Sequence, residues 1–425
     1  MGCPPSKGYQ SGLKLLRILL NTSFVKFTSL FGALAFSWLI SLTMPVSDAG
    51  RLFAVLALVP GMAVFISFGM DQTVLRLGAK RFADEGYPGL SEVMGFGARS
   101  IIRRTALFAM ITVPIALGVW YFWPQKTEIA LQWALALLIA PFFAALVPTA
   151  MGFRVQSRYR RSILSEPSAV MTFAAVGFAA LGLLYEPQFW LAFGAYGVAL
   201  VLLSFPLFSA ISLPPGDPIR HDYHFGITQI AQYFLQWGVI GQISFYATNQ
   251  DIAAISMSMR MVMLINMVLI VVNTVNGNKI SQFIQGDEST ALRQLLRQQS
   301  PILVTTALAA AMVLWISAPY AYGLLSSDFD KATQLTRLLI MGQLVNVCVG
   351  PANLMLNMSG HARIVSRITI SVGLCVTVLV WPFYHFGGVA AAAFLISLSL
   401  ATTSILAAYS ATVATGVRPM WPQGD

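Results

Sequence analysis

Long apolar stretches separated by short polar segments dominate the 425-residue chain. A helix needs about 20 consecutive apolar residues to cross the hydrocarbon core of a bilayer. Stretches of this length predict about twelve transmembrane helices, at 22–44, 51–71, 101–122, 129–150, 163–184, 189–211, 229–248, 252–275, 301–323, 335–357, 364–384 and 388–412. The pattern therefore predicts an all-α polytopic membrane protein with almost no extramembrane domain.

The basic residues are distributed unevenly between the two sides of these helices. With the N-terminus in the cytoplasm, inner segments hold all of the 26 basic residues except Lys26, Arg51, Lys126, Arg260, Lys331 and Arg337. Because positive charge resists translocation, this asymmetry predicts that both termini are cytoplasmic. It also accounts for the net charge of +10 without nucleic acid as a partner, since basic loops can lie against anionic lipid headgroups.

Composition narrows the functional classes further. The chain is 57% apolar and only 10% charged, and its mean hydropathy is +0.72. Its three cysteines and four histidines have no spacing typical of a metal site, and the sequence contains no Walker motif. No outer loop is long enough to hold an active site. We therefore expect no catalytic residue, cofactor or metal, and no enzyme.

The two halves of the chain show the same order of features. An outer turn with Asp48 or Asp251 leads in each half into a helix that is followed by a lysine and an acidic turn. Six predicted helices per half is an even number, so both halves would enter the membrane from the same side as a parallel repeat. We predict an N-terminal six-helix lobe, 1–211, and a C-terminal one, 212–425. Two lobes that rock about a central site are typical of transporters.

Three of the cations at or within the predicted spans are candidate site residues. Lys26 lies near the inner end of the first, Arg51 opens the second, and Arg260 lies about two turns into the eighth. A charge at the depth of Arg260 is costly and usually faces a bundle interior or cavity. Lys26 could instead extend to the inner headgroups, and Arg51 could form a local ion pair with Asp48.

Lys26 shares a helix face with small and hydroxyl-bearing residues. At about 100° per residue, Ser29, Ala33, Ser37 and Ser41 fall on the same face. Such a face could line a water-filled cavity, or its serines could pack against a neighbouring helix.

Amide side chains gather on the seventh, eighth and tenth predicted helices. Amides on facing helices often serve as interhelical hydrogen-bond partners. They also suit a sugar, whose hydroxyls need paired donors and acceptors. The candidate sugar-binding residues are Gln232, Gln236, Asn266, Asn273, Asn346 and Asn353.

Several short motifs resemble those of a known family. The run Asp48-Ala49-Gly50-Arg51-Leu52-Phe53, followed by Phe68-Gly69-Met70 and a cytoplasmic Lys80-Arg81 loop, resembles the first hairpin of Wzx-type polysaccharide flippases. These belong to the multidrug/oligosaccharidyl-lipid/polysaccharide exporter (MOP) superfamily. Asp251-Ile252-Ala253-Ala254 before Arg260 is similar in the second half. The resemblance covers nearly the whole chain in helix order and loop length.

The resemblance implies two six-helix lobes in a V that alternate between inward and outward openings. Members of this family move an oligosaccharide carried on a polyprenyl diphosphate to the outer leaflet of the bacterial inner membrane. The resemblance therefore implies a role in O-antigen or exopolysaccharide synthesis, with membrane lipids, a polysaccharide polymerase and glycosyltransferases as partners to consider. It also implies that Lys26, Arg51 and Arg260 hold the diphosphate, as cations at similar positions do in peptidoglycan-precursor flippases.

Two alternatives stay open. A drug exporter of the same superfamily would favour acidic cavity residues for its cationic substrates, whereas the buried charges predicted here are basic. A membrane-embedded glycosyltransferase or polymerase would need a sizeable outer loop or catalytic carboxylates that face a cleft. The sequence shows neither, and Asp71 is expected only near the inner end of the second span.

The predicted topology can be tested with single cysteines in a variant that lacks Cys3, Cys348 and Cys375. A cysteine at Glu186 should react with an impermeant thiol reagent added to intact cells, whereas cysteines at Arg158 or Glu288 should react only after permeabilisation. Labelling of position 158 from outside would invert the predicted orientation.

Overall fold

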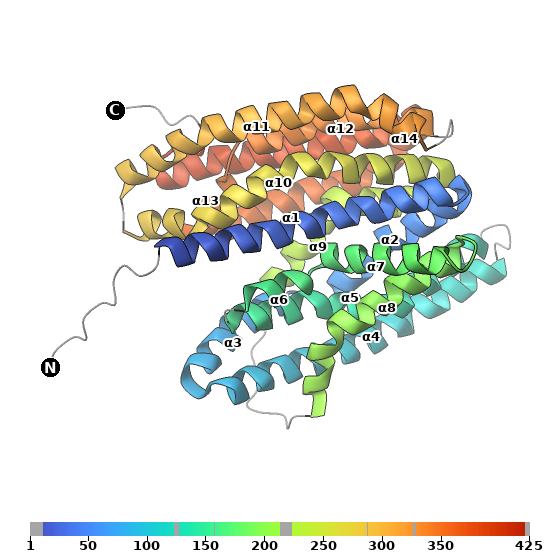
Figure 1. Cartoon of the computed structure of the whole chain (residues 1–425), viewed down its shortest axis with the longest axis horizontal. Helices are drawn as coiled ribbons and strands as arrows, with labels where there is room; N and C mark the ends of the chain where they lie inside the picture. The colour runs from blue at the N-terminus through green and yellow to red at the C-terminus, as the bar shows by residue number, and fades with distance from the viewer. Residues whose placement is uncertain are drawn as a thin grey trace.

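The computed structural model describes residues 12–122, 127–156, 158–212, 223–286, 288–325 and 329–420, and the regular structure in these ranges is entirely helical (Figure 1). The first half of the chain forms α1 (Gly12–Thr43), α2 (Val46–Ser67), α3 (Met70–Glu85), α4 (Tyr87–Phe122), α5 (Thr127–Val155), α6 (Tyr159–Leu164), α7 (Pro167–Gly182), α8 (Phe189–Phe208) and the 3₁₀ turn η2 (Ser209–Ser212). The second half forms α9 (Tyr223–Ile243), α10 (Asn249–Gln285), α11 (Ser289–Gly323), α12 (Asp330–Cys348), α13 (Ala352–Met358) and α14 (Ala362–Thr415).

The predicted spans fall largely within these helices. Seven described helices are long and apolar enough to cross a membrane, and the pair α12 and α13, bent by 42°, passes the same test as one span. The 54-residue α14 contains two predicted spans, and it is broken where the second one begins, at Gly388, whose φ is 62°. The prediction of an all-α polytopic membrane protein is confirmed.

Left-handed residues set the breaks between helices. Phe68 and Gly69, with φ of 44° and 78°, end α2 and turn the chain into α3. Gly350, with φ of 78°, precedes Pro351 between α12 and α13. Glycine adopts this conformation at little cost, and proline cannot donate the hydrogen bond that would continue a helix. The helices therefore end where the sequence supplies these residues.

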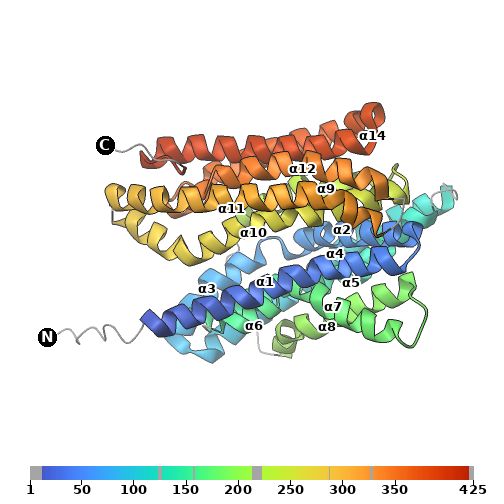
Figure 2. The same cartoon turned by 45° about the horizontal axis from the view of Figure 1, so that its top comes forward.

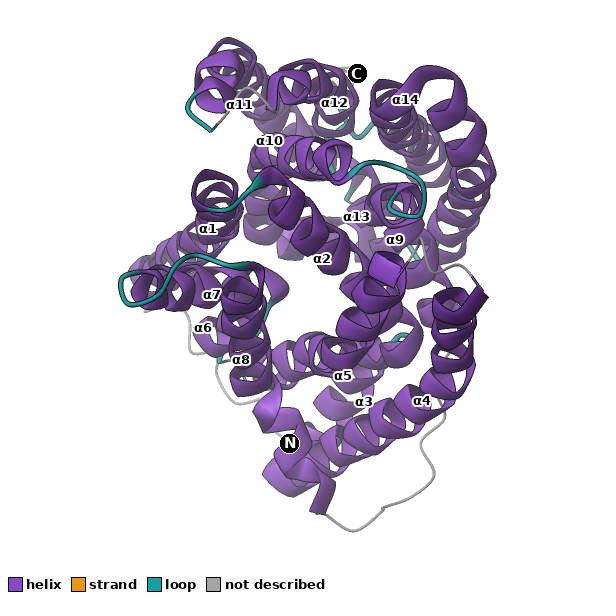
Figure 3. Ribbon diagram, turned by 90° about the vertical axis from the view of Figure 1, so that its right-hand side faces the viewer, coloured by secondary structure: helices purple, strands orange, loops and turns teal. Residues whose placement is uncertain are grey.

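The helices of the two halves gather on opposite sides of the molecule, as Figures 2 and 3 show, and α1 and α2 lie between them. Helix α2 packs against α5 of the first half and against α9 and α10 of the second. Every residue from 52 to 59 is buried, which suits a helix that is apolar on all sides. The lobe boundary at 211 and 212 stays a prediction, because residues 213–222 lie outside the described ranges.

Two glycines of α2 allow close contact with the second half. A Cβ at Gly50 would overlap the backbone carbonyl of Asn249, the first residue of α10. A Cβ at Gly61 would overlap the ring of Tyr233 on α9, whose hydroxyl donates to the carbonyl oxygen of Ala57 at 2.9 Å. The two halves therefore touch along most of the length of α2.

We expect Gly50→Ala to lower the apparent melting temperature of the purified protein in detergent. The added methyl group must push α10 away, and overpacking of this kind costs about 1–3 kcal/mol. Gly118→Ala is the matched control, because a Cβ there meets nothing within 4 Å and α4 should be unchanged or slightly stabilised. Equal melting temperatures for Gly50→Ala and the wild type would show that the contact tolerates extra volume.

Candidate functional site

Arg260 lies at the junction of the two halves, about three turns after α10 begins. It is only 6% exposed. Its Nη1 donates a hydrogen bond to Oγ of Ser37 on α1. Its guanidinium carbon lies 4.7 Å from the ring centre of Phe53 on α2 and 5.8 Å from that of Trp237 on α9. Two helices from each half therefore converge on one cation.

The guanidinium of Arg260 has no acidic partner in the part of the chain that the structure describes. Among the described residues, no carboxylate lies within ion-pair distance of its guanidinium, and its Nε has no hydrogen-bond partner. The aromatic rings offset part of the lost hydration. A buried guanidinium with a free donor favours an anion that enters the site, because two parallel hydrogen bonds to an oxyanion would complete its shell.

Arg260 lines a cavity of about 200 Å³ between the two halves. Its other lining residues come from α1, α7, α9 and α10 and are mostly apolar: Ala33, Leu34, Pro167, Ser168, Met171, Trp237, Met263, Leu264 and Met267. Apolar walls screen charge weakly, so the guanidinium would act strongly on any anion there. Methionine side chains can also adapt to ligands of different shape.

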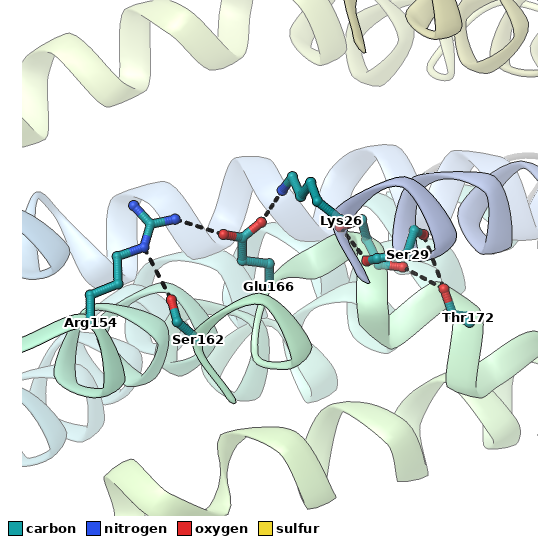
Figure 4. A network of polar contacts seen from close by, with 7 residues as sticks. Lys26, Ser29, Arg154, Ser162, Glu166 and Thr172 are labelled. Carbon is teal, nitrogen blue, oxygen red and sulfur yellow. Dashed lines mark hydrogen bonds and ion pairs between the residues drawn. The ribbon is translucent and has the colours of Figure 1, made fainter. Parts of the chain in front are cut away.

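Lys26 belongs to an ion cluster beside this cavity (Figure 4). Its Nζ pairs with Glu166, and Glu166 Oε1 accepts a second bond from Nη2 of Arg154 at 2.7 Å. Arg154 Nε also donates to Ser162 Oγ at 3.0 Å. Glu166 directly precedes Pro167 of the cavity wall. With two cations to one carboxylate, the cluster keeps a net positive charge next to the cavity.

The predicted polar face of α1 contacts α7 at Ser29 and Arg260 at Ser37. Ser29 Oγ donates to Ser168 Oγ at 2.8 Å, and Thr172 Oγ1 donates to the carbonyl oxygen of Ser29 at 3.0 Å (Figure 4). Two turns later, Ser37 accepts the bond from Arg260. The packing of α1 against α7 thus occupies Ser29, whereas Ser37 contacts the buried cation.

The structure does not bring Arg51 together with Lys26 and Arg260. Its Nη2 pairs with Glu128 of α5, and its Nη1 lies 3.4 Å from Oδ1 of Asp48. It lines a separate cavity of about 410 Å³ bounded by α2, α5 and the region where α8 begins. The three cations that the resemblance assigns to the diphosphate therefore do not line one cavity in this structure, and two carboxylates hold Arg51 in the second turn of α2.

Gln232 lines a second central cavity, of about 260 Å³, between α2, α5 and α9. Asp71 lines it too, and this residue is only 4% exposed in the first turn of α3. Its carboxylate accepts hydrogen bonds from Gln229 at 2.6 Å and from Gln72 at 3.0 Å. The sequence places Asp71 only near a helix end, and its pairing with Gln229 across 158 positions has no local signal. Trp237 lines both central cavities.

Asn266 and Asn346 hydrogen-bond to each other. Nδ2 of Asn346 lies 3.4 Å from Oδ1 of Asn266, which joins α12 to α10. Ser404 of α14 donates to Oδ1 of Asn346 at 2.8 Å. These two amides therefore join helices of the second half.

The other three amide candidates are dispersed. Asn273 has a buried Oδ1 without a partner among the described residues. Asn353 is exposed on α13. The side chain of Gln236 lies outside what the structure describes.

Glu166→Gln should destabilise the protein, because Lys26 and Arg154 would lose their shared carboxylate. The loss should fall between about 1 kcal/mol for an exposed pair and about 3–5 kcal/mol for a buried one. The measurement is the apparent melting temperature in detergent, with exposed Glu186→Gln as the control. The double variant Lys26→Met, Glu166→Gln should recover part of the loss; no difference between Glu166→Gln and the wild type would contradict the assignment.

No protein-family profile matches the sequence, and no curated protein sequence matches it. Solved structures match its fold. An inward-facing multidrug resistance MATE family transporter of the MOP superfamily has 13% identity over 93% of this chain and 98% of its own, with a TM-score of 0.62. A MOP-superfamily transporter from Pyrococcus furiosus, described as having a binding pocket of reverse polarity, has 15% identity over 96% and 99%, with a TM-score of 0.60.

The lipid II flippase MurJ, in an inward-closed conformation, also matches the fold. It has 14% identity over 92% of this chain and 87% of its own, with a TM-score of 0.58. Drug exporters and a lipid flippase thus share this architecture. The chain is a polytopic membrane protein with the fold of MOP-superfamily transporters.

Proposed function

We propose that this chain is a transporter that moves a polyprenyl-diphosphate-linked oligosaccharide from the cytoplasmic to the periplasmic leaflet of a bacterial inner membrane. The observation that carries the proposal is the buried guanidinium of Arg260, which lines a cavity between the two halves without a carboxylate partner among the described residues. A diphosphate offers this group charge and bidentate hydrogen bonds. One of the structures with the same fold is a lipid flippase.

The Lys26 cluster supports an entry step for the anion. Lys26 and Arg154 share Glu166 beside the cavity, so a phosphate oxygen could replace the carboxylate at the lysine without leaving Glu166 unpaired. After this exchange, Glu166 would still be paired with Arg154, and Lys26 would be paired with the phosphate. A diphosphate could then pass along α1 toward Arg260, with a cation at each end of the path.

The second central cavity has a lining that suits a sugar. Gln232 and Trp237 line it, and an amide with an indole suits a group that has both hydroxyls and an apolar face. Trp237 would then separate the diphosphate near Arg260 from the sugar near Gln232. Both cavities are smaller than the usual ligand pocket of about 300–1,000 Å³, so transport of an oligosaccharide requires the two halves to separate.

A drug exporter of the same superfamily is the second candidate. The observation that favours it is Asp71, a buried carboxylate on the second cavity whose partners are neutral amides. A cationic drug could replace Gln229 as the partner of this carboxylate. A glycosyltransferase or polymerase gains no support, because the solved structures named above are drug transporters and a lipid flippase.

Arg260→Ala should abolish transfer while leaving membrane insertion intact, and Arg260→Lys should retain part because charge survives without the bidentate fork. Arg260→Glu should be inactive. The measurement is surface polysaccharide in a strain that lacks the encoding gene and carries each variant at equal membrane levels. Full polymer output from Arg260→Glu would show that this residue does not hold an anion.

Arg337→Ala is the matched control for the Arg260 series. Arg337 also lies against an indole, 5.1 Å from the ring centre of Trp315, but it lines neither central cavity. Its loss should leave polymer output near that of the wild type.

The variant Asp71→Asn separates the two candidate functions. If the protein is a flippase, the variant should keep most of its polymer output. If the protein exports cationic drugs, the variant should lose its drug resistance.

A further inference from the structure

A polar cavity and an apolar groove adjoin each other in the first half, where α4 ends and α5 begins; this end of the bundle faces the viewer in Figure 3. The basic-residue pattern predicts that it is the outer side. Neither feature belongs to the central cavities around Arg260 and Asp71.

The polar cavity, of about 410 Å³, has a size typical of small-molecule sites. Its lining residues with polar or aromatic groups include Asp48, Arg51, Glu128, Gln132, Gln188 and Trp190. Gln132 is only 5% exposed, yet its Oε1 has no hydrogen-bond partner among the described residues, and neither has Nε of Arg51. The cavity therefore contains hydrogen-bonding groups that the described protein leaves unused.

The charges of this cavity disfavour a diphosphate. Arg51 is flanked by Asp48 and Glu128, so the three groups together carry one negative charge. This net negative charge would repel a diphosphate. The neutral hydroxyls of a sugar, in contrast, can donate hydrogen bonds to the carboxylates and accept them from the guanidinium. Trp190 is 57% exposed and offers an indole face against which a sugar ring can pack.

The apolar groove, of about 540 Å³, runs between α4 and α5. Its lining residues include Thr112, Leu117, Trp120, Leu131, Trp133 and Leu138. Leu138 is 64% exposed, and in a membrane such a surface faces lipid. A branched hydrocarbon chain could therefore lie in the groove.

The start of α5 joins the two sites. Thr127 and Leu131 line both, whereas Glu128 and Gln132, each one position further on, line the polar cavity alone. The four residues alternate between two adjacent faces of the helix. A ligand in both sites would have its polar part and its hydrocarbon part next to each other.

From this juxtaposition we propose that the first half holds an outer docking site for the lipid-linked sugar, with saccharide in the polar cavity and isoprenoid chain in the groove between α4 and α5. The proposal rests on the proposed function and deepens it, because it gives Arg51 a sugar as its ligand and gives the chain a site for the translocated product. The diphosphate would lie at the mouth of the cavity, away from Asp48 and Glu128.

Site-specific photo-cross-linking tests the proposal. The full-length protein, with benzoylphenylalanine in place of Leu138, is placed in nanodiscs of phosphatidylethanolamine and phosphatidylglycerol doped with undecaprenyl-diphosphate-linked N-acetylglucosamine. After irradiation, the mass of each adduct identifies its lipid. The same amino acid in place of Val176, an exposed residue of α7, is the matched control.

We expect the undecaprenyl-linked sugar to be enriched over phospholipid at position 138 but not at 176. At subsaturating probe, Gln132→Ala should lower the yield about fivefold, the effect of one lost hydrogen bond, and should not change the yield with undecaprenyl phosphate, which lacks the sugar. Adducts that follow bulk lipid composition at both positions, or a sugar-probe yield that Gln132→Ala leaves unchanged, would overturn the proposal.

The cross-link requires no transport, so the two proposals fail separately. Full polymer output from Arg260→Glu would refute the proposed role of Arg260, and a specific adduct at position 138 could still form. Absence of a specific adduct would remove the outer docking site and leave the role of Arg260 untouched.

Discussion

A charge placed among transmembrane helices must be enclosed by protein, and the arrangement around Arg260 follows from that cost. Lipid supplies no hydrogen-bond acceptor, so the guanidinium needs a hydroxyl and aromatic faces from nearby helices. Ser37, Phe53 and Trp237 supply them from three different helices. The cation thereby ties α1 and α2 of the first half to α9 and α10 of the second, at the junction of the two halves.

The polar groups of the bundle differ in how completely they are neutralised. Among the described residues, the Lys26 cluster holds two cations to one carboxylate, the Arg51 group holds two carboxylates to one cation, and Asp71 has amide partners alone. Arg260, in contrast, has no acidic partner among the described residues. An anion and a neutral sugar would therefore prefer different positions in the same protein.

The sequence predicted the helices well, because the thickness of a bilayer imposes a length that can be read directly from apolar runs. It even placed a boundary between 384 and 388, where α14 is broken at Gly388. It offered the local pair of Arg51 with Asp48 as one of two interpretations, since residues three positions apart on a helix are neighbours. It could not find Glu166 as the partner of Lys26, 140 positions away, or the bond between Asn266 and Asn346, because such contacts depend on how helices pack.

The contact of Gly50 with Asn249 has a mechanical consequence. It joins a backbone position of α2 to a backbone carbonyl at the first residue of α10, so no change of rotamer can loosen or tighten it by degrees. Side-chain contacts can yield gradually, whereas main chains within a helix move only with the whole helix. The two halves therefore meet backbone to backbone at this end, and their separation would break the contact outright instead of loosening it by degrees.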